Sequence, residues 1–344
     1  MAKKLTGRAI GLTLTGAVIG AGFASGQEIK QFFVSYGRYA NRGAVMTIVF
    51  FVIFCSWLMT YCRHHRIAGL PDMLKLMGGK RLGAFFLHLI NLFMWFGLSV
   101  MLAGSATLLA QLWQLPRLAS ALITGLLVYL VARKQVKGLA VANEMLLPLL
   151  IFLVLFFLLR SVGVPEQSLT LVTRQRGWLW SALLYLGSNS AILLTTIPAL
   201  ISETDRRSFK KGVFIAAGLL LFLLLTNIYL LNKYAAVSGD WELPLLPIAQ
   251  YLLPQLPWAY GVILFIALIT TAFANAVSLS KYFQQLWPVR ANFLLLVAIW
   301  AAAFLAQEGF GQLVATLYPL TGYLCLIFYL VSLLRLLFSF DSSC

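Results

Sequence analysis

The sequence predicts an all-α integral membrane protein with ten membrane-spanning helices, arranged as two inverted halves of five. Three observations support this. Hydrophobic residues make up 61% of the 344 residues and charged residues only 10%, which is more apolar surface than a soluble domain can bury. The apolar runs have the length of helices and lack the short alternation of a membrane barrel. Interruptions rich in small residues occur at matching places in the two halves of the chain.

Each predicted span is an apolar run bounded by a loop that contains charged residues, glycine or proline. A helix needs roughly 20 apolar residues to cross the bilayer. The third and eighth runs are longer, so we expect these helices to tilt or to extend beyond the lipid. In chain order the ten predicted spans are 8–36, 42–62, 81–112, 118–132, 139–160, 178–202, 209–232, 257–284, 288–307 and 310–338.

The positive charge of the chain predicts its orientation. The net charge is +16, and the 26 Lys and Arg residues gather in alternate loops. Only eight fall on one side of the membrane: Lys30, Arg38, Arg42, Arg117, Arg160, Arg174, Arg176 and Lys233. Because basic loops stay in the cytoplasm, an even number of spans places both termini there. We therefore expect a multi-pass protein of the cell (inner) membrane, with the lipid bilayer rather than nucleic acid as its partner.

The spacing of the two interruptions predicts an internal repeat. Gly20 and Ser188 are 168 positions apart, close to half of the 344 residues. The predicted repeats are residues 1–170 and 171–344, within a single membrane domain. Because five spans is an odd number, the second repeat must be inverted relative to the first.

The first interruption runs from Gly16 to Gly26 and contains four glycines. Glycines four residues apart are also common in ordinary helix packing. Two overlapping pairs favour an unwound segment, which is tolerated at membrane depth only where it lines a cavity. A helix that restarts after the break offers free N–H groups to a carboxylate. The residues predicted to bind it are Gly20, Ala21, Gly22, Phe23, Ala24 and Ser25.

The second interruption is Gly187, Ser188, Asn189 and Ser190, in the middle of the sixth span. Four small or polar residues would be unfavourable against lipid. Hydrogen bonding between helices is one explanation. The matching position in the repeat favours the other, a second broken helix whose polar groups bind the amino end of a solute. Asn275, in the eighth span, is predicted to face the same cavity.

The segment from Gly16 to Ile29 (GAVIGAGFASGQEI) resembles the signature of YkvI-type permeases, in the amino acid–polyamine–organocation transporter superfamily. The superfamily has a Gly-x-Gly motif in its first span, which Gly20-Ala21-Gly22 matches. The resemblance implies the leucine-transporter fold, with broken first and sixth helices. It also implies that substrate binds between these helices and the third and eighth spans.

The segment Ala267–Thr271 is similar to the Ala-x-x-Ser/Thr-Ser/Thr pattern of sodium-coupled members of this fold. The resemblance implies a sodium site made by the carbonyl groups of Gly16, Ile19 and Ala267 and the hydroxyl groups of Thr270 and Thr271. The alternative is that these threonines bond back to their own helix. Sodium is favoured over protons because residues 139–159 lack the Lys or Arg that sodium-independent relatives place there.

Two acidic residues are candidates for coupling or gating. Glu28 lies about 9 Å beyond Gly22 along a helix, and we expect it in the outer vestibule. It would serve gating or proton coupling there, or be satisfied by Gln27, Lys30 or water. Glu144 lies inside the fifth span, where an acid is by default a functional candidate. Its alternative role is to pair with Lys134 or Lys137.

These patterns together predict a secondary active transporter. The sequence has no Walker motif, metallopeptidase His pair or serine-hydrolase elbow, so we expect no enzyme activity and no cofactor besides a coupling ion. The expected cargo is a small zwitterionic solute, best represented by a neutral amino acid, moved by sodium symport. Spans one, two, six and seven would rock against the rest, and residues 240–253 would form an outer lid. The alternatives are a proton-linked or sodium-independent permease and a membrane nutrient sensor that does not transport.

Overall fold

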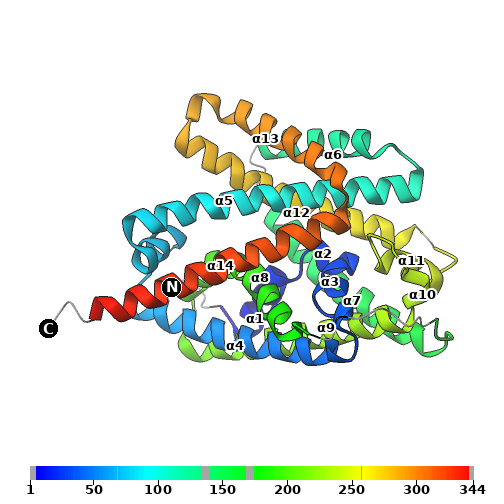
Figure 1. Ribbon diagram of the computed structural model, residues 1–344, viewed down its shortest axis with the longest axis horizontal. Helices are drawn as coiled ribbons and strands as arrows, with labels where there is room; N and C mark the ends of the chain where they lie inside the picture. The colour runs from blue at the N-terminus through cyan, green and yellow to red at the C-terminus, as the bar shows by residue number, and fades with distance from the viewer. Residues whose placement is uncertain are drawn as a thin grey trace.

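The computed structural model is helical throughout, and the residues it describes contain no strand (Figure 1). It describes residues 5–67, 69–133, 139–167, 174, 176–256 and 258–340. Side chains are described for the same residues except 139–146, 202 and 336–340.

The helices match the predicted spans closely. Within the described ranges, seven helices are long and apolar enough to cross a membrane. The other three predicted spans correspond to the broken first helix, to the 17-residue α6 and to α7, whose described apolar part is Leu147–Val162. The long helices are α4 (Ala40–His64), α5 (Leu70–Trp113), α6 (Arg117–Arg133), α7 (Leu139–Val162), α8 (Trp178–Ser202), α9 (Arg206–Lys233), α12 (Ala259–Leu286), α13 (Ala291–Leu305) and α14 (Phe310–Phe340).

The first predicted span is broken where the glycines stand. Helix α1 (Gly7–Val18) ends before Ile19 and Gly20, which have extended backbone, and α2 (Ala21–Ser25) begins directly afterwards. A second bend follows at Gly26, whose φ of 82° lies in the left-handed region that favours glycine. Helix α3 (Gln27–Phe32) and the 3-10 helix η1 (Val34–Tyr39) complete this span. The predicted break at Gly20 is therefore confirmed.

The predicted break in the sixth span is wrong. Helix α8 continues through Gly187, Ser188, Asn189 and Ser190. Their polar side chains satisfy carbonyl groups of their own helix: Ser188 and Asn189 both donate to the Tyr185 carbonyl, at 2.9 Å. Ser190 donates to the Gly187 carbonyl at 2.6 Å. Such local bonds satisfy hydroxyl and amide groups in a membrane helix without unwinding it.

Long helices pack into two groups of four. In the first group α1 and α4 pack against α8 and α9, and in the second α5 and α6 pack against α12 and α13. In Figure 1 the second group lies above the first. Helix α7 packs on α1 and α12, while α14 packs on α8 and α5. Those contacts are equivalent under an exchange of the two halves, as an inverted repeat requires. The repeat boundary at residue 170 stays a prediction.

Short helices close one end of the molecule. Helices α10 (Ala235–Ser238) and α11 (Leu245–Leu252) lie between α9 and α12, at the end opposite the C-terminal end of α14 (Figure 1). The 3-10 helices η2 (Pro288–Arg290) and η3 (Ala306–Glu308) flank α13.

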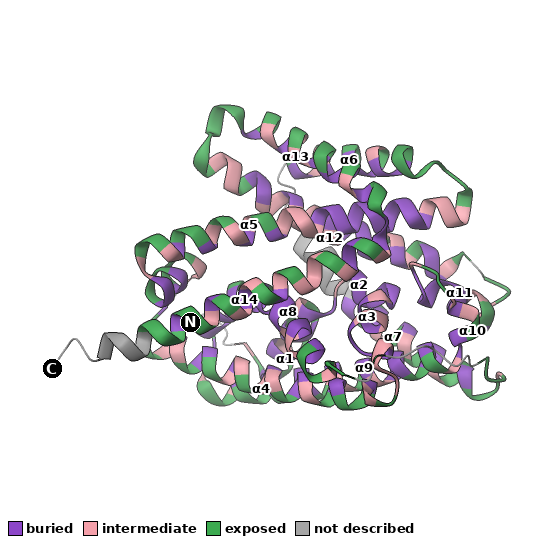
Figure 2. Ribbon diagram, viewed as in Figure 1, coloured by how far each residue is buried: buried purple, intermediate pink, exposed green. Residues whose placement is uncertain are grey.

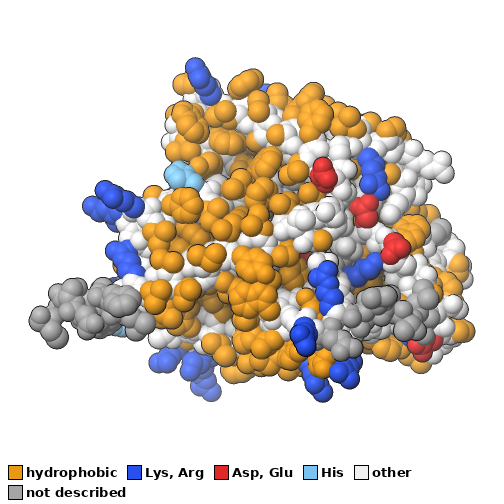
Figure 3. All heavy atoms as spheres, viewed as in Figure 1, with side chains coloured by type: hydrophobic (Ala, Val, Ile, Leu, Met, Phe, Trp, Pro, Cys, Tyr) orange, Lys and Arg blue, Asp and Glu red, His pale blue; other side chains and the backbone are white. Residues whose placement is uncertain are grey.

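Buried residues gather on the faces by which α1 packs on α8 and α2 packs on α12, and the outward faces of the helices are exposed (Figure 2). The exposed faces carry large apolar side chains, among them Ile123, Phe214 and Phe293, each at least 65% exposed. Figure 3 shows hydrophobic side chains over much of one face, with Lys and Arg along its left and lower edges and on its right part. A continuous apolar surface of this extent fits contact with lipid.

Candidate functional site

The break at Gly20 leaves backbone donors free at the start of α2. The N–H groups of the first residues of a helix have no partner within it, and here these residues are Ala21, Gly22 and Phe23. The Ala24 N–H already bonds to the Gly20 carbonyl, at 3.1 Å. A side chain added at Gly20 would meet no atom within 4 Å, so there is free space beside the break. Three donors of the predicted set are therefore free at the break.

The Ser25 side chain is engaged within the broken span, whereas the prediction that its backbone N–H binds the solute stays a prediction. Its hydroxyl donates to the Gly22 carbonyl at 2.7 Å and accepts the Gln27 N–H at 3.2 Å. Those bonds stabilise the bend at Gly26. Ser25 is fully buried and acts as part of the local backbone structure.

Glu28 lies against the break rather than in an outer vestibule, so that prediction is wrong. The residue is only 3% exposed. A Cβ atom at Gly22 would lie 1.9 Å from Glu28 Oε1, so the carboxyl group occupies the space that a side chain at position 22 would need. A side-chain hydrogen bond joins Glu28 to Tyr318 of α14. Lys30 does not pair with Glu28, because its Nζ donates to the Gly239 carbonyl at 2.7 Å.

A second tyrosine completes this cluster. The Tyr185 side chain of α8 is 1% exposed, lies close enough to Glu28 to interact electrostatically, and packs its ring on Phe32 and Phe33. Its hydroxyl group is buried and has no partner among the described residues. We name Glu28, Tyr185 and Tyr318 the carboxyl–tyrosine cluster. Neither tyrosine is among the residues predicted for the site, and the signal in the sequence is a hydroxyl group within an apolar span.

The predicted polar residues of α8 do not meet α2 as a set. Gly187 packs on Gly322 of α14. A Cβ atom added at Gly187 would lie 2.9 Å from the Gly322 carbonyl oxygen. Ser190 faces the same helix and accepts a bond from the Tyr329 hydroxyl at 2.7 Å. Asn189 borders a small space lined by Val18 and Phe51, among others, and Ser188 is buried. Gly187 and Ser190 therefore serve helix packing rather than the break.

The five predicted sodium ligands fall into two sets. On α12, the hydroxyl groups of Thr270 and Thr271 donate to the Ala267 carbonyl at 3.1 and 2.9 Å, which brings these three oxygens together. Thr270 also donates to the Ile266 carbonyl. On α1, Gly16 is exposed and its nearest side-chain neighbour is Leu147 of α7. Ile19 is buried in the extended segment.

Two further candidates have different positions. Asn275 is half-buried on α12 and faces α5, because a Cβ atom at Gly97 would lie 2.8 Å from Asn275 Nδ2. It therefore lies between α12 and α5, away from the contacts described for α2. Glu144 belongs to α7, but its side chain lies outside the described residues.

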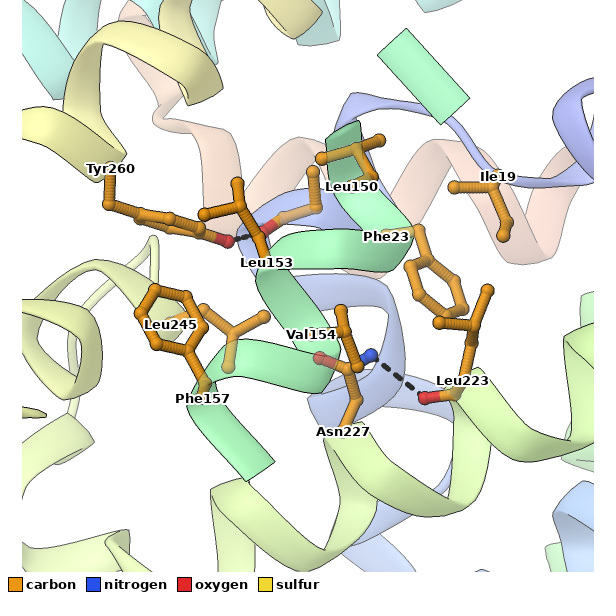
Figure 4. Close-up of a pocket in the computed structure, with 11 residues that line it drawn as sticks. Ile19, Phe23, Leu150, Leu153, Val154, Phe157, Leu223, Asn227, Leu245 and Tyr260 are labelled. Atoms are coloured by element: carbon orange, nitrogen blue, oxygen red, sulfur yellow. Dashed lines mark hydrogen bonds between the residues drawn. The ribbon is translucent and has the colours of Figure 1, made fainter. Parts of the chain in front are cut away.

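An apolar cavity lies beside α2 and is lined by α7, α9, α11 and α12 (Figure 4). The cavity volume is about 10 Å³, which is room for one water molecule. Asn227 of α9 lines it, donating from Nδ2 to the Leu223 carbonyl at 2.8 Å while its Oδ1 has no partner among the described residues. The Tyr260 hydroxyl donates to the Ala24 carbonyl and ties α12 to α2. This space is too small for a solute in this conformation.

Comparison with known proteins gives two relatives of similar length, and no family model matches the chain. An uncharacterized membrane protein, YkvI of Bacillus subtilis, is 27% identical over 91% of this chain and 91% of its own. A second uncharacterized protein of that species, YyaD, is 24% identical over 92% and 95%.

Comparison with solved structures identifies the fold. The inward-facing conformation of Mhp1 matches with a TM-score of 0.65 and 15% identity, over 94% of this chain and 74% of Mhp1. A manganese transporter of Eremococcus coleocola matches with a TM-score of 0.55 and 15% identity, over 96% and 78%. The chain is thus a multi-pass membrane protein with the leucine-transporter fold, as the sequence predicted.

Proposed function

We propose that the chain is a secondary active transporter that moves a small zwitterionic solute, best represented by a neutral amino acid, by sodium symport. One observation carries the proposal: the break at Gly20 lies between the two groups of helices. Helix α1 packs on α9 in the first group, whereas α2 packs on α12 in the second. A relative movement of the groups would therefore change the structure at the break, which is what alternating access requires.

The free N–H groups of Ala21, Gly22 and Phe23 suit the solute carboxylate in this proposal. The oxygens of Ala267, Thr270 and Thr271 would provide one side of a sodium site, and the carbonyl groups of Gly16 in α1 and of Ile19 directly after it would provide the other. No other cofactor is proposed. The termini are placed in the cytoplasm by the distribution of Lys and Arg.

One of the structural neighbours is a cation symporter, which supports cation coupling in this proposal. One Mhp1 structure is described as a nucleobase-cation-symport-1 family transporter with bromovinylhydantoin bound, and it matches with a TM-score of 0.54. The other neighbour is a manganese transporter. Among the described residues no three His, Cys, Asp or Glu side chains gather as a metal site, so this part of the chain gives no reason to propose a metal as cargo.

The test is thermal unfolding of the purified protein with a panel of neutral amino acids, in sodium and then in potassium buffer. A ligand that binds only the folded state raises the midpoint by mass action. We expect a rise that needs both an amino acid and sodium. T271A should abolish the sodium dependence and T271S should keep it, because serine retains the hydroxyl group. Sodium-dependent stabilisation that survives in T271A would contradict the ion site.

Uptake into proteoliposomes separates transport from sensing. We expect accumulation of the stabilising amino acid when sodium is higher outside. Binding without uptake would favour the nutrient-sensor alternative.

A further inference from the structure

Glu28 is a buried carboxyl group that has no cationic partner among the described residues. It lies 3% exposed between Gly22 and Tyr318. Transfer of an unpaired carboxylate into an apolar interior is very unfavourable, and such a group becomes neutral by taking up a proton. The contacts of this conformation therefore favour the carboxylic acid form.

The charged and titratable groups around α3 are engaged elsewhere. Helix α2 has none, α8 offers Tyr185 and α14 offers Tyr318. In η1, Arg38 donates to Tyr39 at 2.9 Å, and Tyr36 lies by Gly177. On α9, Lys233 donates to the Ser161 carbonyl at 2.6 Å. Lys30, on α3 itself, bonds to Gly239 and interacts with Asp240. Glu242 of the nearby loop pairs with Arg117.

The remaining charged and titratable side chains of α9 and α14 lie elsewhere on these helices. Lys211 contacts Gly7 at the start of α1, and Arg335 contacts Gly79 of α5. The others are Arg206, Arg207, Lys210, Tyr229, Tyr323, Cys325 and Tyr329, none of which contributes to the electrostatic interactions of Glu28.

The protonation of Glu28 would be linked to the helix break because its carboxyl group contacts α2. The Glu28 carboxyl group rests on Gly22 in α2, and α2 moves with α12 if the two groups of helices separate. Movement that lets water reach the carboxyl group would favour the carboxylate and release the proton to water. Closure would reverse this step. Proton binding and conformation are then linked, and the linkage is reciprocal.

We propose that Glu28 is a proton-carrying site, which binds a proton when the first membrane helix is closed around it and releases the proton when the break opens. The link to cargo movement rests on the proposed function, whereas the proton-holding step does not. The proton would move in addition to sodium.

Infrared difference spectroscopy of the purified protein tests whether Glu28 is protonated, and it needs no transported solute. The wild type should show the carbonyl band of a protonated carboxylic acid at pH 7, and this band should be absent from E28Q. E242Q is the matched control and should keep it, because Glu242 pairs with Arg117. Y318F should shift the band frequency, since it removes the hydrogen bond. The same spectrum for E28Q and wild type at pH 7 would overturn the proposal.

Proteoliposomes loaded with equal sodium on both sides test the coupling, with labelled alanine as probe. An acidic outside should drive accumulation by the wild type. E28Q mimics the protonated form, so it should exchange alanine but not accumulate it. Equal accumulation by E28Q would overturn the coupling. Absence of alanine uptake by the wild type would contradict the proposed function, and the infrared result would then decide the proton site alone.

Discussion

At the scale of single residues, glycines have four different uses in this chain. Gly20 leaves free space beside the extended break, Gly22 makes room for the Glu28 carboxyl group, and Gly26 adopts the left-handed backbone of the second bend. Gly187 lets α8 approach α14. The sequence shows all four as small residues in apolar spans. Only their neighbours distinguish an unwound segment from a packing contact.

Gly22→Ala should destabilise the protein, because the new Cβ would lie 1.9 Å from Glu28 Oε1. Overpacking of this kind costs about 1–3 kcal/mol, so the thermal midpoint should fall. The double variant G22A/E28A should recover most of the loss, since the two side chains no longer compete for the same space. G20A is the matched control, because its Cβ would meet no atom within 4 Å. Equal midpoints for G22A and G20A would contradict the contact.

At the scale of elements, α8 shows why a polar sequence does not always break a helix. Ser188, Asn189 and Ser190 each donate to a carbonyl group of α8 itself, so no group requires unwinding. Polar residues of this kind occur both in broken helices and in packed ones. Whether α8 unwinds or stays helical depends on α14, whose Gly322 packs on Gly187.

Gly322→Ala should disrupt the crossing of α8 and α14. Its Cβ would lie 2.6 Å from the Leu184 carbonyl oxygen, a backbone atom that cannot turn aside. We expect a loss of about 1–3 kcal/mol, measured as a lower thermal midpoint in detergent. Gly218→Ala on α9 is the control, because nothing lies within 4 Å of the added atom. Alanine there should be neutral or stabilising by up to about 1 kcal/mol. A midpoint for G322A at or above that of G218A would refute the crossing.

The loop that carries α11 is held to the second group of helices by Glu242. Its carboxylate accepts from Arg117 at 2.9 Å, from the Gly311 N–H at 3.1 Å and from Thr107 at 3.4 Å. Leu245 of α11 packs on Gly26 in the broken span. The loop therefore packs on the second bend of the first span, at Gly26, and its role as a lid stays a prediction.

Glu242→Ala should loosen this packing. A cysteine placed at Leu245 should then react about fivefold faster with a thiol reagent, if the partly exposed ion pair contributes about 1 kcal/mol. A Cys344→Ser background suits the experiment because Cys55, Cys62 and Cys325 are buried. Glu308→Ala, which alters an exposed acid on η3, should leave the rate unchanged. No acceleration in E242A would show that Glu242 does not hold the loop.

At the scale of the whole molecule, the two groups of helices define the unit that can move. Helices α1, α4, α8 and α9 are the predicted spans one, two, six and seven, and they pack together as one group. Helices α7 and α14 lie against both groups. This arrangement permits the two groups to rock about the break while α7 and α14 keep them in contact.

The orientation of the whole molecule can be tested with fusions. Because most basic residues fall in loops on one side, we expect the C-terminus in the cytoplasm. A green fluorescent protein fused there should fluoresce, and a periplasmic phosphatase should be inactive. The same reporters placed after Arg117, on the predicted outer side, should give the reverse. A phosphatase active at the C-terminus would invert the topology.

The sequence by itself determined the fold class, the ends of nearly all the spans and the break at Gly20. It could do so because apolar run length and glycine content act locally. A run of about 20 apolar residues must be a membrane helix in lipid, and Gly26 adopts its left-handed backbone without the steric penalty of a side chain. Tertiary structure decided the rest. In the tertiary structure α8 stays continuous, the Glu28 carboxyl group packs on Gly22, and Tyr185 and Tyr318 lie beside Glu28. Those outcomes depend on which helices cross and at what distance, and residues 100 or more positions apart set that distance through their packing rather than through any local pattern.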